Sequence, residues 1–291
     1  MIKIEHESKG LVSHGVSACA GCGMELVMRS VMNAVGEDTV LIIPPGCAAL
    51  FSGSGKETAV KVAGYQCNLE NVAATASGVR AALTAKGNFH TTVLGFAGDG
   101  GTVDIGLQSL SGAMERNENI LYICYDNEAY MNTGVQASSS SPKYAYTTTT
   151  PAGKPVNRKD LIGVAIAHGV PYAATASVCN LRDLQNKVKK AKETEGFSLV
   201  HVHAPCPTGW RYDPAKTIEV ARAAVETGCW ILYEYENKEI KLSNPRKELK
   251  PLDGYLKLQG RFKHLTDGQR EEMQREIAAF YDSFIEKAAQ G

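Results

Sequence analysis

Two loops hold the residues of this chain that are best suited to chemistry, and each loop follows an apolar, strand-like run. The first loop is the run Gly-Asp-Gly-Gly at residues 98–101, and the second spans residues 126–134. In open α/β sheets, ligands bind beside the carboxyl ends of the strands. Glycines let the backbone approach a phosphate, and a following helix N-terminus favours negative charge. Asp99 and the amide oxygen of Asn127 are hard ligands suited to Mg²⁺. The two loops therefore predict a site for a phosphate ligand that carries magnesium.

The order of these residues resembles the motif with which thiamine diphosphate enzymes bind their cofactor: Gly-Asp-Gly, a spacer, and then Asn. The resemblance implies that Asp99, the Asn127 side chain and the Ala129 carbonyl bind Mg²⁺ on the diphosphate. Two ordinary turns between strands and helices are the alternative, because Gly-Asp-Gly is common in turns. The position directly after a strand, with a matching second loop, favours the cofactor site.

Four of the eight cysteines lie in turns that are rich in glycine and proline. Cys19 and Cys22 form a C-x-x-C motif ahead of a helix, whereas Cys47 and Cys206 each follow a strand-like run. Strand ends of one sheet converge in space, and four thiolates suit a [4Fe–4S] cluster or a structural zinc. Taken alone, the C-x-x-C motif fits a redox dithiol, half of a zinc site or half of a cluster site equally well.

The other cysteines have simpler interpretations. Cys124 lies in an apolar run and Cys229 lies beside Trp230, so both are expected to act as small core residues. Cys179 precedes an expected helix and is also interpreted as structural, whereas Cys67 stays ambiguous.

The elements that must position these residues alternate between helical and strand-like patterns. Helices are expected at residues 25–35, 70–85, 104–116, 159–168, 181–193 and 266–289, and strands at residues 39–43, 91–97, 120–125, 170–174 and 198–203. Strands separated by helices imply parallel pairing through right-handed crossovers. The predicted fold is α/β, with a doubly wound, mostly parallel sheet and helices on both faces. Residues 1–235 are expected to form this domain, and residues 236–291 an arm and a helix that dock on it or on a partner.

Two further segments gave specific expectations. The Ser/Thr-rich residues 138–151 have the composition of a loop or a disordered segment, but their place after the cofactor loop favours an ordered active-site or interface loop. In the C-terminal helix, Thr266 is the expected cap. The expected apolar stripe of that helix consists of Met273, Ile277, Phe280, Tyr281 and Phe284.

Composition restricts the class of protein. The chain has 291 residues, of which 44% are hydrophobic and 21% charged, as in ordinary globular proteins. Its 31 basic residues balance 31 acidic ones, which argues against a surface for nucleic acid or anionic membrane. Residues 1–7 lack the apolar core of a signal peptide, and no apolar run is long enough to span a bilayer. We expect a cytoplasmic protein, in which cysteines serve metal or redox chemistry rather than disulfides.

Together, the cysteines and the cofactor loops resemble the beta subunits of pyruvate:ferredoxin oxidoreductases (pyruvate synthases), in the 2-oxoacid:ferredoxin oxidoreductase family. The matching segments follow the family order from the N-terminus to about Tyr235, and residues 259–264 (Gln-Gly-Arg-Phe-Lys-His) add a match near the end. The segments are residues 19–23, 44–47, 98–106, 122–134, 147–151 and 205–210.

The resemblance implies a set of site residues. Cys19, Cys22, Cys47 and Cys206 would hold a [4Fe–4S] cluster close to thiamine diphosphate, and Asp99, Asn127 and Ala129 would hold Mg²⁺. Asn132 would be a catalytic contact to the reacting intermediate. The residues implied around the cofactor are Gly98, Asp99, Gly100, Gly101, Asn127, Ala129, Tyr130, Asn132 and Thr133.

The resemblance also implies a reaction and partners. Pyruvate, coenzyme A and oxidised ferredoxin would be converted reversibly into acetyl-CoA, CO₂ and reduced ferredoxin. A separate alpha subunit would bind the pyrimidine half of the cofactor and much of the substrate, a delta subunit would carry ferredoxin-like clusters, and a gamma subunit would complete the complex. No nucleic acid or membrane partner is expected.

One segment departs from the family pattern. Residues 64–70, which include Cys67, do not match the pyruvate enzymes well, and this leaves oxalate, branched-chain and aromatic 2-oxoacids open as substrates. A non-oxidative thiamine enzyme such as a decarboxylase, with zinc or free thiols, is a second hypothesis. A metal-binding scaffold subunit without an active cofactor site is a third. The density of matching motifs favours the oxidoreductase.

Overall fold

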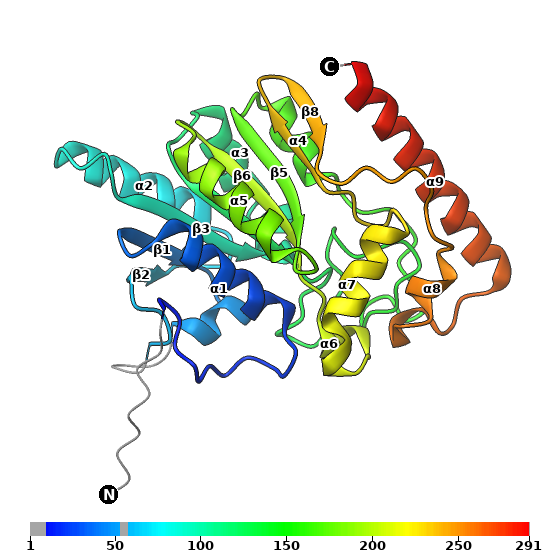
Figure 1. Cartoon of the computed structure of the whole chain (residues 1–291). Coiled ribbons are helices and arrows are strands. Elements are labelled where there is room, and N and C mark those ends of the chain that lie inside the picture. Colours follow the sequence, from blue (N-terminus) through cyan, green and yellow to red (C-terminus); the bar gives the residue numbers. More distant parts are fainter. Residues whose placement is uncertain (1–9, 53–57, 291) are drawn as a thin grey trace, which may run out of the picture.

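A single mostly parallel sheet organises the chain in the computed structural model, which describes residues 10–52 and 58–290 (Figure 1). The eight strands lie in the order β2-β1-β3-β4-β6-β5-β7-β8. The six strands from β2 to β5 in this order pair in parallel, whereas β7 and β8 are antiparallel. The strands are β1 (Thr39–Ile43), β2 (Ala63–Gln66), β3 (Thr92–Gly98), β4 (Leu121–Asp126), β5 (Tyr172–Ser177), β6 (Ser198–His203), β7 (Tyr233–Glu236) and β8 (Glu239–Leu242).

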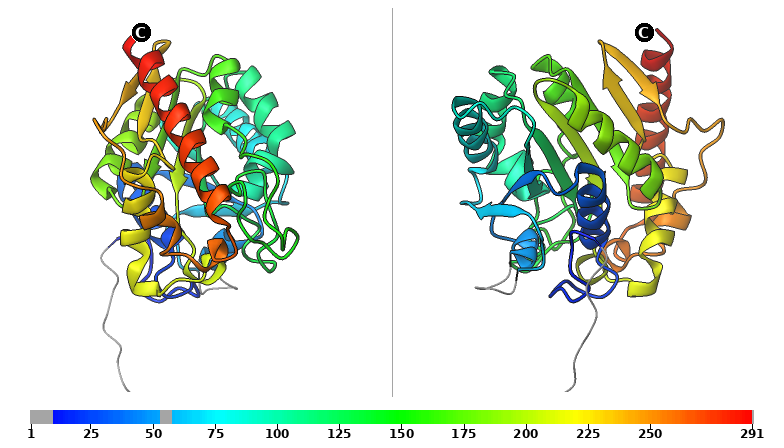
Figure 2. Two further views of the ribbon diagram at one scale, coloured as in Figure 1. Left: turned by 90° about the vertical axis from the view of Figure 1, so that its right-hand side faces the viewer. Right: turned by 60° about the vertical axis from the view of Figure 1, so that its left-hand side comes forward.

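Helices cover both faces of this sheet, as the two views of Figure 2 show. The helices α1 (Gly23–Val35) and α5 (Leu181–Glu193) pack together on one face. The opposite face carries α2 (Val72–Ala85), α3 (Leu107–Glu115), α4 (Leu161–Ala167) and part of α9 (Asp267–Gln290). The shorter α6 (Pro207–Trp210), α7 (Thr217–Glu226) and α8 (Asp253–Leu256) gather near the start of α9. The predicted doubly wound α/β class is therefore confirmed.

The central strand β4 shows why this sheet forms. Leu121, Ile123 and Tyr125 belong to the core under α1 and α5, whereas Tyr122 and Cys124 belong to the core under α2, α3 and α4. Every residue of β4 is buried. A continuous apolar run of this kind is typical of a strand that is covered on both faces.

Several elements differ from the sequence-based expectation. The edge strand β2, the β7–β8 hairpin and α7 were not predicted. All four residues of β2 are exposed, so this strand carries no alternating pattern of burial. The helix expected from residue 104 begins instead at Leu107, because Gly100–Asp104 form a wide π-helical turn immediately after Asp99.

The C-terminal helix α9 begins with the expected cap. The Gln269 amide donates to Thr266 Oγ1 at 3.3 Å, and the Thr266 amide donates to Gln269 Oε1 at 3.0 Å. Met273, Tyr281 and Phe284 are buried against the rest of the chain, but Phe280 is 54% exposed. Phe280 therefore lies on the stripe beside Phe284 but is not covered by the rest of the chain. Docking of residues 236–291 on a partner subunit stays a prediction.

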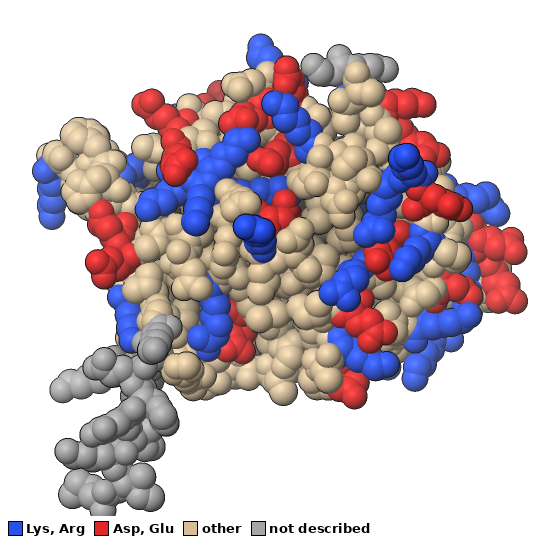
Figure 3. Space-filling model, in the orientation of Figure 1, with Lys and Arg blue, Asp and Glu red and all other residues tan. Residues whose placement is uncertain are grey.

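The surface and the termini bear on the remaining expectations. Basic and acidic side chains are interspersed over the face shown in Figure 3, in agreement with the balanced charge. Within residues 10–52 and 58–290, no helix combines the length and the apolarity that crossing a bilayer requires. Residues 1–7, which gave the expectation about a signal peptide, lie outside the described residues.

Candidate functional site

The two loops singled out in the sequence meet at the carboxyl edge of the sheet. Strands β3 and β4 are neighbours, with Gly98 paired to Tyr125, so the loops that follow them start side by side. Asp99, Asn127 and Ala129 are buried there, with exposures of 1%, 5% and 3%. The structure thus brings together the three residues that the sequence assigned to magnesium.

The geometry of these three residues suits a cation. One end of the Asn127 amide faces Ala129 O at 2.8 Å and Asp99 Oδ1 at 3.0 Å. With its nitrogen turned inward, the amide donates to both oxygens. With its oxygen turned inward, three oxygens converge, and only a cation between them makes that favourable. Carboxylate, amide and carbonyl oxygens are ligands that Mg²⁺ accepts, so the residues fit the ion.

The charge at Asp99 is poorly balanced by the chain itself. Burial, and next the neighbouring Asp126, raise the pKa of Asp99 well above its usual value. Asp126 has a partner of its own, since its Oδ2 lies 2.7 Å from His201 Nε2. Although burial opposes ionisation, this hydrogen bond holds the pKa of Asp126 below its usual value. A divalent cation at Asp99 would supply the compensating charge that the described residues do not provide.

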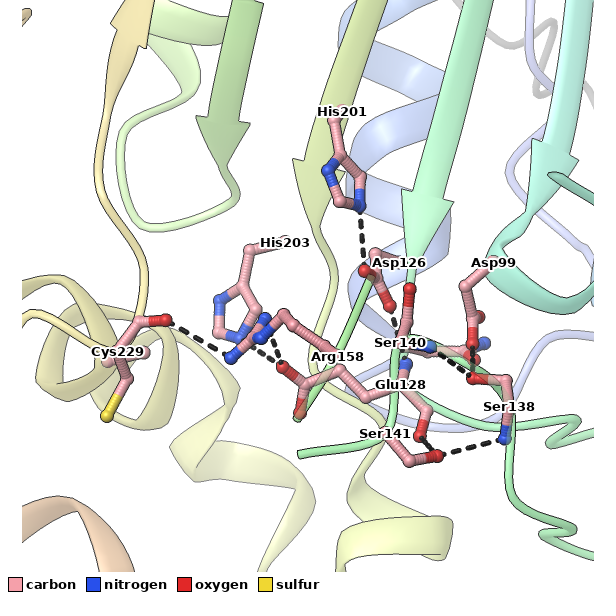
Figure 4. Close-up of polar contacts among 12 residues, drawn as sticks. Asp99, Asp126, Glu128, Ser138, Ser140, Ser141, Arg158, His201, His203 and Cys229 are labelled. Atoms are coloured by element: carbon pink, nitrogen blue, oxygen red, sulfur yellow. Dashed lines mark hydrogen bonds and ion pairs between the residues drawn. The ribbon is translucent and has the colours of Figure 1, made fainter. Parts of the chain in front are cut away.

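The Ser/Thr-rich segment is ordered and lies against this site (Figure 4). The Ser138 hydroxyl donates to Asp99 Oδ2, and the Ser141 hydroxyl donates to Glu128 O at 2.5 Å. Lys154 Nζ donates to Ser141 O at 2.7 Å. The sequence indicated an ordered loop here but gave no reason to single out Ser138, which fixes one oxygen of Asp99 while the other faces Asn127.

The glycines of the first loop allow close packing by aromatic and aliphatic side chains. A Cβ at Gly100 would lie 2.3 Å from Tyr130 Cε1, and one at Gly98 would lie 3.1 Å from Tyr125 Cε2. A Cβ at Gly101 would lie 3.2 Å from Leu69 Cδ1. The Tyr130 hydroxyl also donates to Gly100 O at 3.2 Å, so this ring holds the two loops together.

Replacing Gly100 by alanine is expected to push Tyr130 away and weaken cofactor binding about tenfold or more, since overpacking costs roughly 1–3 kcal/mol. Calorimetric titration of thiamine diphosphate with Mg²⁺ into the assembled complex measures this. Gly78→Ala in α2 is the matched control, because its Cβ would have no neighbour within 4 Å. Equal affinities in the two variants would show that Tyr130 is not needed at the site.

Asn132 and Thr133 lie apart from the buried part of the site. Both are exposed in the turn at residues 131–134. Thr133 Oγ1 donates to Gln136 Oε1 at 2.5 Å, which closes the turn. Their predicted contacts with the cofactor, and the catalytic role of Asn132, stay predictions.

The four turn cysteines come from segments that touch one another. The Gly23 amide, next to Cys22, donates to Pro205 O, next to Cys206, at 3.2 Å. The Gly209 amide donates to Cys206 Sγ at 3.3 Å. In the third cysteine turn, the amide of Ala48, which follows Cys47, donates to the Tyr125 hydroxyl at 3.1 Å. The turns of Cys22 and Cys206 therefore touch each other, and the Cys47 turn contacts Tyr125 at the end of β4, one residue before the second loop of the site.

The thiols influence one another electrostatically. Burial is the largest cause that raises the pKa of Cys22 to about 11 and that of Cys47 to about 12, and the other turn cysteines contribute to both increases. Across the residues that the structure describes, no three Cys, His, Asp or Glu side chains are close enough to share one metal ion. The ligands of a four-iron cluster bind different irons and stand farther apart, so the residue types and their loose grouping fit the cluster better than zinc.

Cys67 packs in the core rather than at the site. Its thiol donates to Asn68 O at 3.2 Å, and burial raises its pKa. Two other residues of the segment at 64–70 differ in their surroundings: Tyr65 is 60% exposed to solvent, whereas Leu69 lies beside Gly101. The segment that departs from the family pattern therefore touches the first loop of the site.

Two hollows lie near these residues. An open pocket of about 530 Å³ adjoins the loops and is lined by Asp104, Tyr130, Ser138 and Lys154, among others. A more enclosed cavity of about 280 Å³ lies between α9 and the sheet, with His201 and Trp230 in its lining. Only the open pocket shares Tyr130 and Ser138 with the candidate cofactor loops, so it is the better place for a ligand of that site.

Comparison with known proteins decides the family. The chain is 48% identical over 281 residues to the pyruvate synthase subunit PorB of Methanothermobacter thermautotrophicus, with 95% of this chain and 97% of that protein covered. This chain belongs to the same oxidoreductase family. The resemblance seen in the sequence motifs is thereby confirmed. The C-terminal TPP binding domain of thiamine pyrophosphate enzymes matches residues 45–202 of this oxidoreductase subunit.

Other relatives act on a different 2-oxoacid. The ketoisovalerate oxidoreductase subunit VorB of Pyrococcus abyssi is also 48% identical, over 273 residues that cover 90% of this oxidoreductase subunit and 88% of the relative. Among solved structures, the 2-oxoglutarate:ferredoxin oxidoreductase from Magnetococcus marinus shares the fold, with a TM-score of 0.61 at 23% identity. The superposition covers 76% of this chain and 82% of that one.

Proposed function

We propose that this chain is the beta subunit of a 2-oxoacid:ferredoxin oxidoreductase complex that acts on pyruvate. In the balanced reaction, pyruvate, coenzyme A and two oxidised ferredoxins give acetyl-CoA, CO₂, two reduced ferredoxins and one proton. The observation that carries the proposal is the convergence of Asp99, Asn127 and Ala129 on one point beside the cysteine turns. Family membership supports the same reaction class.

Asp99, Asn127 and Ala129 would hold Mg²⁺ on the diphosphate of the cofactor. Bound thiamine diphosphate supplies the nucleophilic ylid and an electron sink. The chain contributes orientation, because a buried and hydrogen-bonded set of ligands fixes where the diphosphate lies. Ser138 would orient Asp99, and Tyr130 would keep the two loops together. The exposed Asn132 and Thr133 would reach the cofactor from the turn.

The turns of Cys19, Cys22, Cys47 and Cys206 would hold one [4Fe–4S] cluster. The cluster would lie close to the magnesium site. The Ala48 amide, next to Cys47, donates to the Tyr125 hydroxyl at the end of β4, and the loop that carries Asn127 and Ala129 (the magnesium loop) begins directly after this strand. Electrons would thus have a short path from the cofactor to the cluster and on to ferredoxin. A nearby one-electron acceptor distinguishes this chemistry from simple decarboxylation.

The complex would include three further subunits in the cytoplasm. An alpha subunit would supply the pyrimidine-binding part and much of the substrate pocket, a delta subunit would carry ferredoxin-like clusters, and a gamma subunit would complete the assembly. A subunit partner is supported by the names of the relatives.

A branched-chain 2-oxoacid is the second candidate substrate. The ketoisovalerate and pyruvate enzymes match this chain at the same identity of 48%. The divergent segment at residues 64–70 places Leu69 beside Gly101 in the first loop of the site.

Anaerobic EPR of the complex purified through this chain tests both candidates. With coenzyme A present, we expect pyruvate to produce reduced iron–sulfur signals, and 3-methyl-2-oxobutanoate (the ketoisovalerate substrate) to do so at least about tenfold more slowly, a typical effect for extra methyl groups in a pocket. Faster reduction by the branched acid would reassign the substrate. A complex without iron would overturn the oxidoreductase function.

A further inference from the structure

The segment at residues 259–264, which matched the family but received no role, leads to the cofactor loops through Arg261. This arginine is only 2% exposed. Its Nη2 lies 2.6 Å from Glu128 Oε2, and its Nε donates to Gln259 Oε1 at 2.8 Å. Its guanidinium carbon lies 3.6 Å from the centre of the Trp210 ring. Arg261 therefore contacts one residue of the magnesium loop and one residue that follows a cysteine turn.

Trp210 connects the cysteine turn to the magnesium loop. It ends α6, which starts directly after Cys206, and its backbone amide donates to Cys206 O at 2.9 Å. Its indole Nε1 donates to Asn127 O at 2.8 Å. The ring is fully buried. One side chain thus binds the backbone of a candidate magnesium ligand and belongs to the turn of a candidate cluster ligand.

Glu128 stands between two candidate magnesium ligands in a strained conformation. Its φ of 65° is unusual for a residue with a side chain and costs about 1–3 kcal/mol. The fully buried carboxylate faces Arg261, Arg158 at 3.1 Å and His203 at 4.0 Å. This conformation lies between Asn127 and Ala129, where the Asn127 amide faces both the Ala129 carbonyl and the Asp99 carboxylate.

We propose that Glu128, Trp210 and Arg261 (the clamp) are positioning residues that aim Asn127 and Ala129 at the magnesium ion. The inference rests on the proposed function, because it assumes that the ion binds there. Stability alone does not explain the clamp, since a buried ion pair is often no more stabilising than apolar residues of similar size. A pair that instead holds a strained loop in one conformation has a use at a ligand site.

The test measures magnesium affinity rather than turnover. The complex is stripped of cofactor with a chelator, saturated with thiamine diphosphate and titrated with Mg²⁺ in a calorimeter. Trp210→Phe keeps a ring over Arg261 but removes the N–H that binds Asn127 O. Residues that orient metal ligands typically change affinity by about 10–100-fold, so we expect the dissociation constant of this variant to rise about tenfold. Arg261→Met should raise it further.

Arg80→Met is the matched control. Arg80 is another buried arginine, bonded to the Asn88 and Thr91 carbonyls, and it belongs to α2 rather than to the clamp. Its replacement should lower the melting temperature and leave magnesium affinity within about twofold, well below the range for ligand-orienting residues. Unchanged affinity in Trp210→Phe and Arg261→Met, or an equal loss in Arg80→Met, would overturn the clamp. A wild-type complex that binds no Mg²⁺ would instead overturn the proposed function.

Discussion

Replacing Asp99 by asparagine is expected to lower kcat/KM for the 2-oxoacid by at least about 10³-fold, which corresponds to roughly 4 kcal/mol. The reason is that the carboxylate is the only charged group among the three candidate magnesium ligands, and metal anchoring is worth several kcal/mol. Stopped-flow reduction of ferredoxin by the complex measures the rate. Calorimetry with Mg²⁺ and thiamine diphosphate tests whether binding is lost in parallel.

The same substitution should leave the fold intact. Because burial raises the pKa of Asp99, its charge is costly in the chain without a cation, and a neutral amide removes that cost. We therefore expect the melting temperature of the cofactor-free complex to stay the same or rise. Asp38→Asn is the control, since Asp38 is exposed and bonds to His90 and Thr91 away from the site. Activity within about tenfold of wild type in Asp99→Asn, a loss of no more than roughly 1.4 kcal/mol, would favour a scaffold subunit.

The central sheet was predictable because its strands are buried on both faces. Residues 39–43 and 198–203 were placed with the bounds that β1 and β6 have. Strand β2 was missed because its residues face solvent in this chain. The β7–β8 hairpin was missed because Glu, Lys and Tyr alternate there with few apolar residues. Patterns of hydrophobicity report burial, and neither β2 nor β8 has a buried residue.

The sequence predicted only those site residues that belong to a short, continuous sequence motif. Asp99, Asn127 and Ala129 were found because each follows a strand end, and neighbouring parallel strands bring such ends together. Ser138, Glu128 and Arg261 were not found, although all three are buried within one network. Their contacts arise when segments distant in the sequence pack together, and no spacing rule relates them. The contacts between the cysteine turns were likewise visible only in the folded structure, because these turns are distant in the sequence.

Cys206 gives the clearest test of the iron–sulfur assignment. The Gly209 amide donates a hydrogen bond to Cys206 Sγ at 3.3 Å. Such a bond stabilises a negatively charged sulfur, as in a cysteine thiolate that binds a metal. Burial raises the pKa of Cys206, so a free thiol at this position stays protonated and unreactive. Only a bound cation, such as the iron of a cluster, would make the thiolate the stable form.

Replacing Cys206 by alanine is expected to remove one [4Fe–4S] cluster and to slow 2-oxoacid-dependent ferredoxin reduction by at least about 10³-fold, because electrons lose their nearest acceptor. Thiamine diphosphate affinity should change by less than about tenfold, or 1.4 kcal/mol. Iron analysis, EPR and calorimetry on the same preparation measure the three quantities. Cys179→Ala is the matched control, because Cys179 is also half-buried with a raised pKa, yet its titration is not influenced by any turn cysteine. Full iron content in Cys206→Ala would contradict the assignment of Cys206 as a ligand of the cluster.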